Sequence, residues 1–304
     1  METDRVEAAA ESWRIVVFTT VPNGFVLKLV DDVAGRLGHR VVAVVTTPGP
    51  ERRRSADYLS VVESTPPNVD VLVSNHPSRW ADIVAVWKPD LIVSGGFAWL
   101  IPEAVTSIPR LGAFNIHPAL LPRNRGPAPI EWALRNGDTE MGFTAHRISN
   151  AFDTGALLAQ IREPIEDDDT AGSLLDKLES RLPELVGRAI SRIAQGDAGE
   201  PQDEGRATYA GLFEPEWREI DWQQPARTIH NQVRSWIGFR DTPRGAFGVI
   251  DGDRMLITQT RLPKEGAAPL ASPPGTVLDR TEDDVIVQCG DGPLTILEWS
   301  RTDP

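Results

Sequence analysis

Two polar side chains, Asn115 and His117, end an apolar stretch of the sequence, and an acidic side chain, Asp153, follows further along the chain. Because side chains alternate along an extended strand, Asn115 and His117 project to the same side. An Asn amide can donate to a developing oxyanion, a His can accept a proton near neutral pH, and a carboxylate favours the charged form of a neighbouring His. Together the three residues supply the groups that acyl transfer needs without a nucleophilic Ser or Cys.

Each of these signals also has a purely structural explanation. A His at the end of a strand is more often a member of a buried hydrogen-bonded network than a catalyst, and Asp153-Thr154-Gly155 is a common turn sequence. The ordered combination is more specific than any of its parts. We therefore predict that Asn115, His117 and Asp153 are catalytic, and keep a buried polar network as the alternative.

An alternation of strand and helix patterns surrounds these residues. Strands are expected at residues 14–19, 41–46, 69–73, 91–94 and 111–117, an edge strand at 156–161, and helices at 26–37, 80–87 and 170–194. Such alternation predicts a Rossmann-like, doubly wound parallel sheet of the α/β class, which binds ligands at the carboxyl ends of its strands. The turn at residues 19–24 lacks Gly-x-Gly-x-x-Gly, so a dinucleotide site is not predicted.

The pattern changes after a polar, Gly-rich stretch at residues 195–205. A helix is expected at residues 225–236, followed by short strands at 246–250, 255–260, 275–278, 285–289 and 294–299. Short, closely spaced strands are typical of a small open β-barrel of the OB-like kind. We predict an irregular tail at residues 1–13, a catalytic domain at 14–195, a linker at 196–212 and a barrel domain at 213–304.

Composition limits the class of protein. The chain has 304 residues, a formal charge of −13, one cysteine and five scattered histidines. The single Cys289 excludes an internal disulfide, and no metal-ligand spacing is present. The sequence has no apolar run of 18 residues and no signal-peptide pattern at its start. We expect a cytoplasmic protein that uses no metal and does not contact a membrane.

Four sequence segments together resemble the folate-dependent formyltransferase superfamily. They are Asn115 to Gly126, with Leu-Leu-Pro before an Arg-Gly pair, then Pro129-Ile-Glu-Trp132, Gly142-Phe-Thr-Ala-His146 and Asp153-Thr-Gly155. Residues 219–246 resemble the C-terminal barrel domain of the same superfamily, which includes methionyl-tRNA formyltransferases, sugar-nucleotide N-formyltransferases and the hydrolase domain of 10-formyltetrahydrofolate dehydrogenase. The resemblance covers the chain apart from about its first dozen residues.

The resemblance implies transfer of a formyl group from N10-formyltetrahydrofolate to an amine. In this interpretation Asn115 stabilises the oxyanion, His117 takes the proton of the attacking nitrogen, and Asp153 supports the imidazolium. The residues expected to bind the folate are Gly96, Phe97, Leu100, Ile101, Ala151, Asp153 and Gly155. Those expected to bind the acceptor are Arg123, Arg125, Gly126 and Pro127. His146 is expected to be structural or to act only through a neighbour.

Two positions depart from the superfamily pattern: Ala119 stands where Ser is usual, and Asn124 replaces an aromatic residue. The resemblance places both in the loop on the acceptor side, so they leave the catalytic set unchanged and leave the identity of the acceptor open.

Charge separates the candidate acceptors. Residues 213–304 contain 10 Lys and Arg against 15 Asp and Glu, a net charge of −5, which fits a polyanionic tRNA poorly. We therefore predict a small-molecule amine or hydroxylamine, such as an amino sugar nucleotide or an amino-acid derivative. Methionyl-tRNA is the alternative, favoured by Arg52-Arg53-Arg54. Two further functions are left open, a 10-formyltetrahydrofolate hydrolase and a catalytically silent binding module. A homodimer is also left open.

Overall fold

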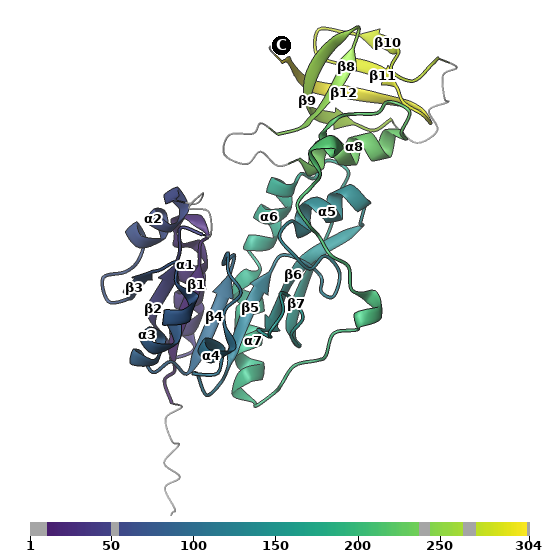
Figure 1. The fold of residues 1–304 in the computed structure, drawn as a ribbon. Helices are drawn as coiled ribbons and strands as arrows, with labels where there is room; N and C mark the ends of the chain where they lie inside the picture. Colours follow the sequence, from purple (N-terminus) through teal and green to yellow (C-terminus); the bar gives the residue numbers. More distant parts are fainter. Residues whose placement is uncertain (1–10, 50–54, 237–243, 264–271, 303–304) are drawn as a thin grey trace, which may run out of the picture. The chain divides into compact units, whose positions relative to one another are not determined.

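The computed structural model describes residues 11–49, 55–236, 244–263 and 272–302 (Figure 1). Arg52, Arg53 and Arg54, and most of the predicted tail, lie outside these ranges. The chain forms two compact units. Unit 1 comprises Met1–His117, Phe143–Ile161 and Arg181–Arg206, and unit 2 comprises Pro118–Gly142, Arg162–Ser180 and Ala207–Pro304. The domains predicted from the sequence are contiguous stretches with boundaries at residues 195 and 213, whereas each compact unit combines separate segments of the chain. The predicted domain boundaries stay a prediction.

A seven-stranded sheet has the order β3-β2-β1-β4-β5-β6-β7. Its strands are β1 (Arg14–Thr19), β2 (Arg40–Thr46), β3 (Asp70–Val73), β4 (Leu91–Gly95), β5 (Ala113–His117), β6 (Glu140–Arg147) and β7 (Leu157–Pro164). Strands β1 to β5 pair in parallel, and β6 pairs antiparallel to β5. The predicted doubly wound sheet is confirmed, with the difference that its last part is mixed. Strands β6 and β7 contribute residues to both units.

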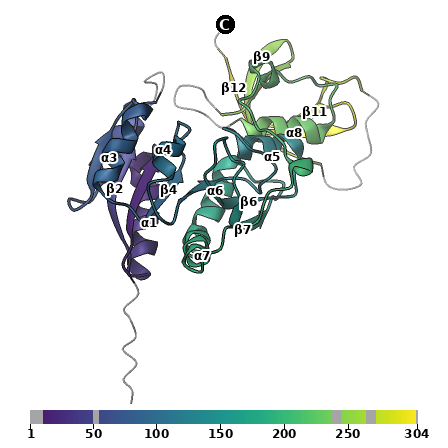
Figure 2. The ribbon, with the colours of Figure 1, turned by 60° about the horizontal axis from the view of Figure 1, so that its bottom comes forward.

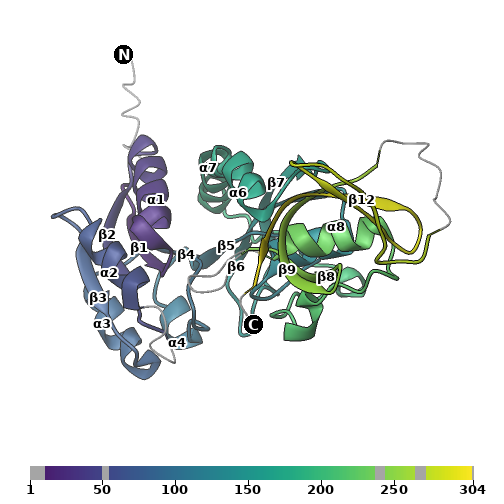
Figure 3. The same ribbon diagram turned by 90° about the horizontal axis from the view of Figure 1, so that it is seen from above.

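Unit 1 covers both faces of this sheet. Helices α1 (Phe25–Arg36) and α7 (Leu182–Ala194) lie on one face, and α3 (Trp80–Val86) and α4 (Glu103–Thr106) lie on the other (Figure 3). A further helix, α2, spans Ser55–Glu63. Strands β1 and β4 are almost wholly buried, which explains their continuous apolar sequences. On the α3 face, Trp80 packs edge-on against Phe18, and both are fully buried.

The sequence predicted one helix over residues 170–194, and this was wrong. The structure has two helices, α6 (Ala171–Glu179) and α7, which begins at Leu182. Pro183 lies in the first turn of α7. Inside a continuous helix its nitrogen could not donate to the carbonyl four residues earlier, whereas at a helix start no donor is needed.

Unit 2 contains a five-stranded antiparallel sheet of order β10-β11-β12-β9-β8 (Figure 1). The strands are β8 (Ala246–Ile250), β9 (Asp253–Arg261), β10 (Val277–Arg280), β11 (Val285–Gln288) and β12 (Pro293–Arg301). Helix α8 (Ala226–Ser235) packs beside α5 (Pro129–Asn136) (Figure 2). The predicted helix at 225–236 and all five predicted short strands are confirmed within a few residues.

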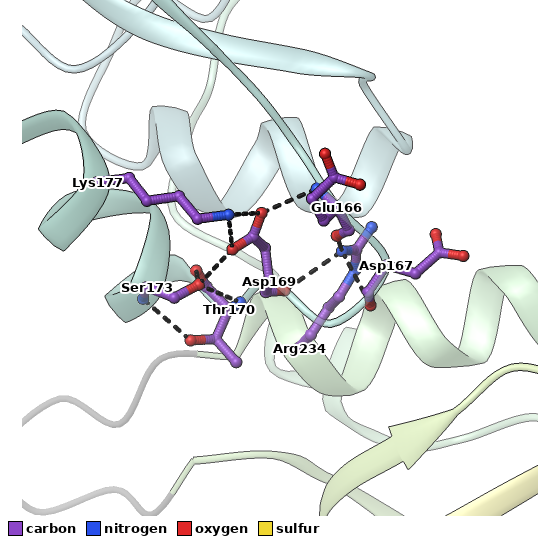
Figure 4. Close-up of polar contacts among 7 residues, drawn as sticks. All are labelled: Glu166, Asp167, Asp169, Thr170, Ser173, Lys177 and Arg234. Carbon is purple, nitrogen blue, oxygen red and sulfur yellow. Dashed lines mark hydrogen bonds and ion pairs between the residues drawn. The ribbon is translucent and has the colours of Figure 1, made fainter.

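A polar network in unit 2 fixes the loop that precedes α6 (Figure 4). The Asp169 carboxylate accepts from Lys177 Nζ at 2.7 Å and from Ser173 Oγ at 2.7 Å. Thr170 and Ser173 form a capping box at the start of α6, which satisfies backbone N–H groups that the helix leaves unpaired. From α8, Arg234 Nη1 donates to the carbonyls of Glu166 and Asp169. The loop is therefore held from two helices.

His230 of α8 reaches the same loop. Its Nε2 lies 2.7 Å from the Asp167 carbonyl oxygen, and its Nδ1 lies 2.8 Å from Thr260 Oγ1. A carbonyl only accepts, so Nε2 carries the proton and Nδ1 accepts from the hydroxyl. Burial lowers the pKa of His230 to about 4.

We expect acid to weaken the fold through His230. The folded pKa of about 4 lies below the unfolded value of 6.5, so the unfolded chain binds this proton first as the pH falls. The stabilising contribution is complete above pH 6.5 and is lost progressively towards pH 4, by up to about 1.4 kcal/mol per pH unit. Urea unfolding between pH 7.5 and 5 should therefore show that the free energy of unfolding depends less steeply on pH in His230→Gln than in the parent chain. Equal slopes would contradict this assignment.

Candidate active site

The carboxyl end of β5 carries Asn115 and His117 on one side, as predicted. Across the antiparallel pair, His146 of β6 lies directly opposite Asn115, and Thr144 lies opposite His117. Asn115 Nδ2 is 3.2 Å from His146 Nε2. His117 and His146 are both buried, and their rings meet edge-on with centroids 6.4 Å apart. Two adjacent strands therefore bring three polar side chains to one end of the sheet in unit 1.

Asp153 reaches this cluster from the turn between β6 and β7. Its Oδ1 lies 3.6 Å from His117 Nδ1 and 3.5 Å from His146 Nε2, and its side chain is 8% exposed. The backbone of Asp153 has a φ of +59°, a left-handed conformation that Asp tolerates better than most residues. The structure thus brings the predicted set Asn115, His117 and Asp153 together and adds His146.

His146 orients the amide of Asn115. His146 Nδ1 lies 2.9 Å from the Arg147 carbonyl oxygen, which only accepts, so in the neutral ring Nδ1 carries the proton. Nε2 lies 3.2 Å from Asn115 Nδ2 and 3.5 Å from Asp153 Oδ1. In the neutral ring Nε2 accepts from one N–H group of Asn115, whose amide carries a second N–H on the same nitrogen, and in the protonated ring Nε2 faces the carboxylate as a donor. The sequence assigned His146 no direct role; its motif, Gly142-Phe-Thr-Ala-His146, was the available signal.

The turn that carries Asp153 packs closely on the end of β6. A Cβ atom at Gly155 would lie 1.8 Å from the Arg147 carbonyl oxygen, so only glycine fits. The Arg147 N–H donates to the Ala156 carbonyl at 2.8 Å. Gln202 also holds the turn, because its Nε2 donates to the carbonyls of Asp153 and Gly155, both at 2.8 Å.

The residues expected to bind folate lie in two stretches of unit 1. Gly96 follows β4 beside β1, where the winding order of the sheet reverses, a usual ligand site in such sheets. It has a φ of +58°, and its carbonyl accepts from Thr20 Oγ1 at 2.6 Å. Phe97 and Ile101 pack into the core on the α3 face, whereas Leu100 is 37% exposed.

The second stretch, which holds Ala151 and Gly155, is tied to the first. Asn150 Nδ2 donates to Glu103 Oε2 at 3.2 Å, two residues beyond Ile101. Ala151 is exposed, and so is Phe152 beside it. Folate binding by these residues stays a prediction.

The residues expected to bind the acceptor belong to unit 2. Arg123 Nη2 forms an ion pair with Asp138 Oδ1 at 2.7 Å, and Arg125 exchanges backbone hydrogen bonds with Thr208 and Ala210. Gly126 has a φ of +113°, and a Cβ there would lie 2.8 Å from the Ala210 carbonyl oxygen. Pro127 is exposed. Acceptor binding by these four residues also stays a prediction.

Asn124 has a structural explanation for its departure from the superfamily pattern. Its φ is +56° and its side chain is buried. Its backbone N–H donates to Thr208 Oγ1 at 2.8 Å. Asn adopts left-handed conformations more readily than an aromatic residue does.

In the described ranges, no group of three or more His, Cys, Asp and Glu side chains is arranged to hold a metal ion. Within the same ranges, no helix is long and apolar enough to cross a membrane.

Comparison with known proteins identifies the family. Residues 13–190 match the formyl transferase family, and residues 213–303 match the formyl transferase C-terminal domain. This chain belongs to the formyltransferase family. It is 34% identical over 299 residues to methionyl-tRNA formyltransferase of Pelobacter propionicus, covering 94% of this chain and 88% of that protein. It is 38% identical over 225 residues to the enzyme of the same name from Marinobacter nauticus, covering 74% and 70%.

Solved structures share the fold at lower identity. HypX from Aquifex aeolicus in complex with tetrahydrofolic acid matches with a TM-score of 0.63 and 22% identity, over 96% of this chain and 45% of that one. The N-formyltransferase from Helicobacter canadensis, in complex with folinic acid and dTDP-3-aminofucose, matches with a TM-score of 0.68 and 18% identity. That match covers 95% of this chain and 100% of the other.

We expect Gly155→Ala to destabilise the turn. The added methyl group must displace the Arg147 carbonyl or the turn itself, and overpacking of this kind typically costs about 1–3 kcal/mol. The matched control is Gly35→Ala in α1, where a Cβ meets nothing within 4 Å and alanine should stabilise the helix slightly. Urea unfolding of the two variants measures the difference. Parent-like stability of Gly155→Ala would contradict the packing described.

Proposed function

We propose that this protein transfers the formyl group of N10-formyltetrahydrofolate to a primary amine. The observation that carries the proposal is the cluster that Asn115 and His117 of β5 form with Asp153, in which His117 and Asp153 are buried and Asn115 is half-buried. Membership of the formyltransferase family supports it. Relatives of known structure contain tetrahydrofolic acid or folinic acid, which supports a reduced folate as the donor.

The cluster fits the chemistry of a formyl carbonyl. Attack by the amine places negative charge on the carbonyl oxygen, and an Asn115 N–H can donate to it, an interaction typically worth about 3 kcal/mol in such sites. His117 takes the proton of the attacking nitrogen and returns it to the departing nitrogen of the folate. The Asp153 carboxylate, 3.6 Å from His117 Nδ1, stabilises the positive charge that forms on the ring.

Two acceptors remain in competition, each with an observation in its favour. Relatives named methionyl-tRNA formyltransferase match at 33–38% identity, so we place the amine of methionyl-tRNA first. The net charge of −5 over residues 213–304 favours a small-molecule amine instead. The net charge alone had placed a small-molecule amine before methionyl-tRNA as the acceptor, and the similarity to these relatives reverses that order.

We expect an acceptor assay to separate the two. The full chain is incubated with N10-formyltetrahydrofolate and either methionyl-tRNA or a panel of amino sugar nucleotides and amino-acid amines, and tetrahydrofolate release is followed with product mass. Formyl-methionyl-tRNA, formed with a rate that falls steeply as salt rises, is the expected result. Formylation of a small amine alone would establish the second candidate. Folate turnover without any formylated product would indicate a hydrolase, and an absence of donor consumption would overturn the proposal.

A further inference from the structure

Gln202 lies in the segment predicted as a linker, yet its side chain contacts the turn that carries Asp153. The amide nitrogen of a glutamine has two hydrogens, and Gln202 directs them to two carbonyl oxygens of one turn, those of Asp153 and Gly155. Both distances are 2.8 Å. A bidentate contact of this kind constrains the orientation of the turn more than a single bond does.

The backbone around Gln202 is itself fixed in unit 1. Glu200 exchanges both backbone hydrogen bonds with Leu157, the first residue of β7. Asp197 pairs with Arg192 Nε of α7 at 2.7 Å and accepts from the Gly199 N–H at 2.8 Å. Because residues 197–200 are anchored to α7 and β7, Gln202 is presented to the turn from a defined position.

The turn needs such support. Asp153 has a left-handed backbone, with a φ of +59°. Asp adopts this conformation more readily than most residues but still at some cost in free energy, which surrounding contacts offset. Its carboxylate nevertheless lies 3.6 Å and 3.5 Å from two histidine rings, an arrangement that a small rotation of the turn would disrupt.

We propose that Gln202 is a positioning residue that holds the Asp153 carboxylate against His117 and His146. The inference rests on the proposed function, because it assigns Gln202 to the catalytic arrangement rather than to the stability of a linker. The contacts that carry this role are the two hydrogen bonds from Gln202 to the backbone of the turn.

Two substitutions and one control test this role. Gln202→Ala removes both hydrogen bonds, and Gln202→Glu keeps the shape but replaces the donor with a charge that repels the carbonyls. Gln232→Ala is the matched control, because Gln232 also donates to two backbone carbonyls, those of Trp217 and Glu219, in unit 2. Both Gln202 variants should lower formyl-transfer turnover by about 10- to 100-fold, the loss expected when a catalytic group is misplaced by up to 1 Å. The control should keep parent-like turnover per folded molecule.

A double-mutant cycle separates positioning from general stability. If Gln202 acts by placing the Asp153 carboxylate, Gln202→Ala should cost much less turnover in the Asp153→Asn background than in the parent. Equal losses in the two backgrounds would overturn the proposal, as would parent-like turnover of both Gln202 variants.

Hydrogen–deuterium exchange provides a readout that does not depend on activity. Faster exchange at residues 153–156 is expected in Gln202→Ala and not in Gln232→Ala. Unchanged exchange in Gln202→Ala would contradict the proposal that Gln202 holds the turn. If the parent chain transfers no formyl group, the proposed function is wrong. Hydrogen–deuterium exchange at residues 153–156 would still show whether Gln202 holds the turn.

Discussion

The packing of Gly155 on the carbonyl oxygen of Arg147 is the contact on which the site depends. With 1.8 Å between that oxygen and the place of a Cβ atom, the turn can approach β6 only because Gly155 has no side chain. That approach brings Asp153 to the two histidines. The same Arg147 carbonyl accepts from His146, so one backbone oxygen fixes both the turn and the ring that orients Asn115.

Rigid elements surround this contact, which is why the polar cluster can be buried. Asn115, His117 and His146 stand on paired strands. Asn115 lies within hydrogen-bond distance of His146, and His117 faces the Asp153 carboxylate. A buried polar group costs less free energy when it has such a partner. The segment 200–211 adds a second kind of support. In unit 1 its Gln202 holds the Asp153 turn. In unit 2 its residues Thr208 and Ala210 hydrogen-bond to the loop at Arg125.

Much of the fold could be predicted from the sequence because central strands such as β1 and β4 are buried on both faces and read as apolar runs. Local spacing also placed Asn115 and His117 on one side of β5.

The sequence missed the break between α6 and α7, since apolar positions continue across it and only Pro183 marks it. The contacts of Asp153 and of Gln202 depend on a left-handed turn and on pairing between distant segments, which no local pattern encodes. The acceptor was not predictable, because net charge does not reveal how charges are distributed on a surface.

The most direct test of the catalytic assignment is to measure formyl-transfer turnover and melting temperature together on His117→Ala. If His117 is the general base, turnover should fall by about 100-fold or more, while the melting temperature and the affinity for reduced folate stay near those of the parent chain. If the cluster is only a buried polar network, the melting temperature should fall instead, and activity should decline only as folded protein is lost. A well-folded His117→Ala protein with parent-like turnover would contradict the account.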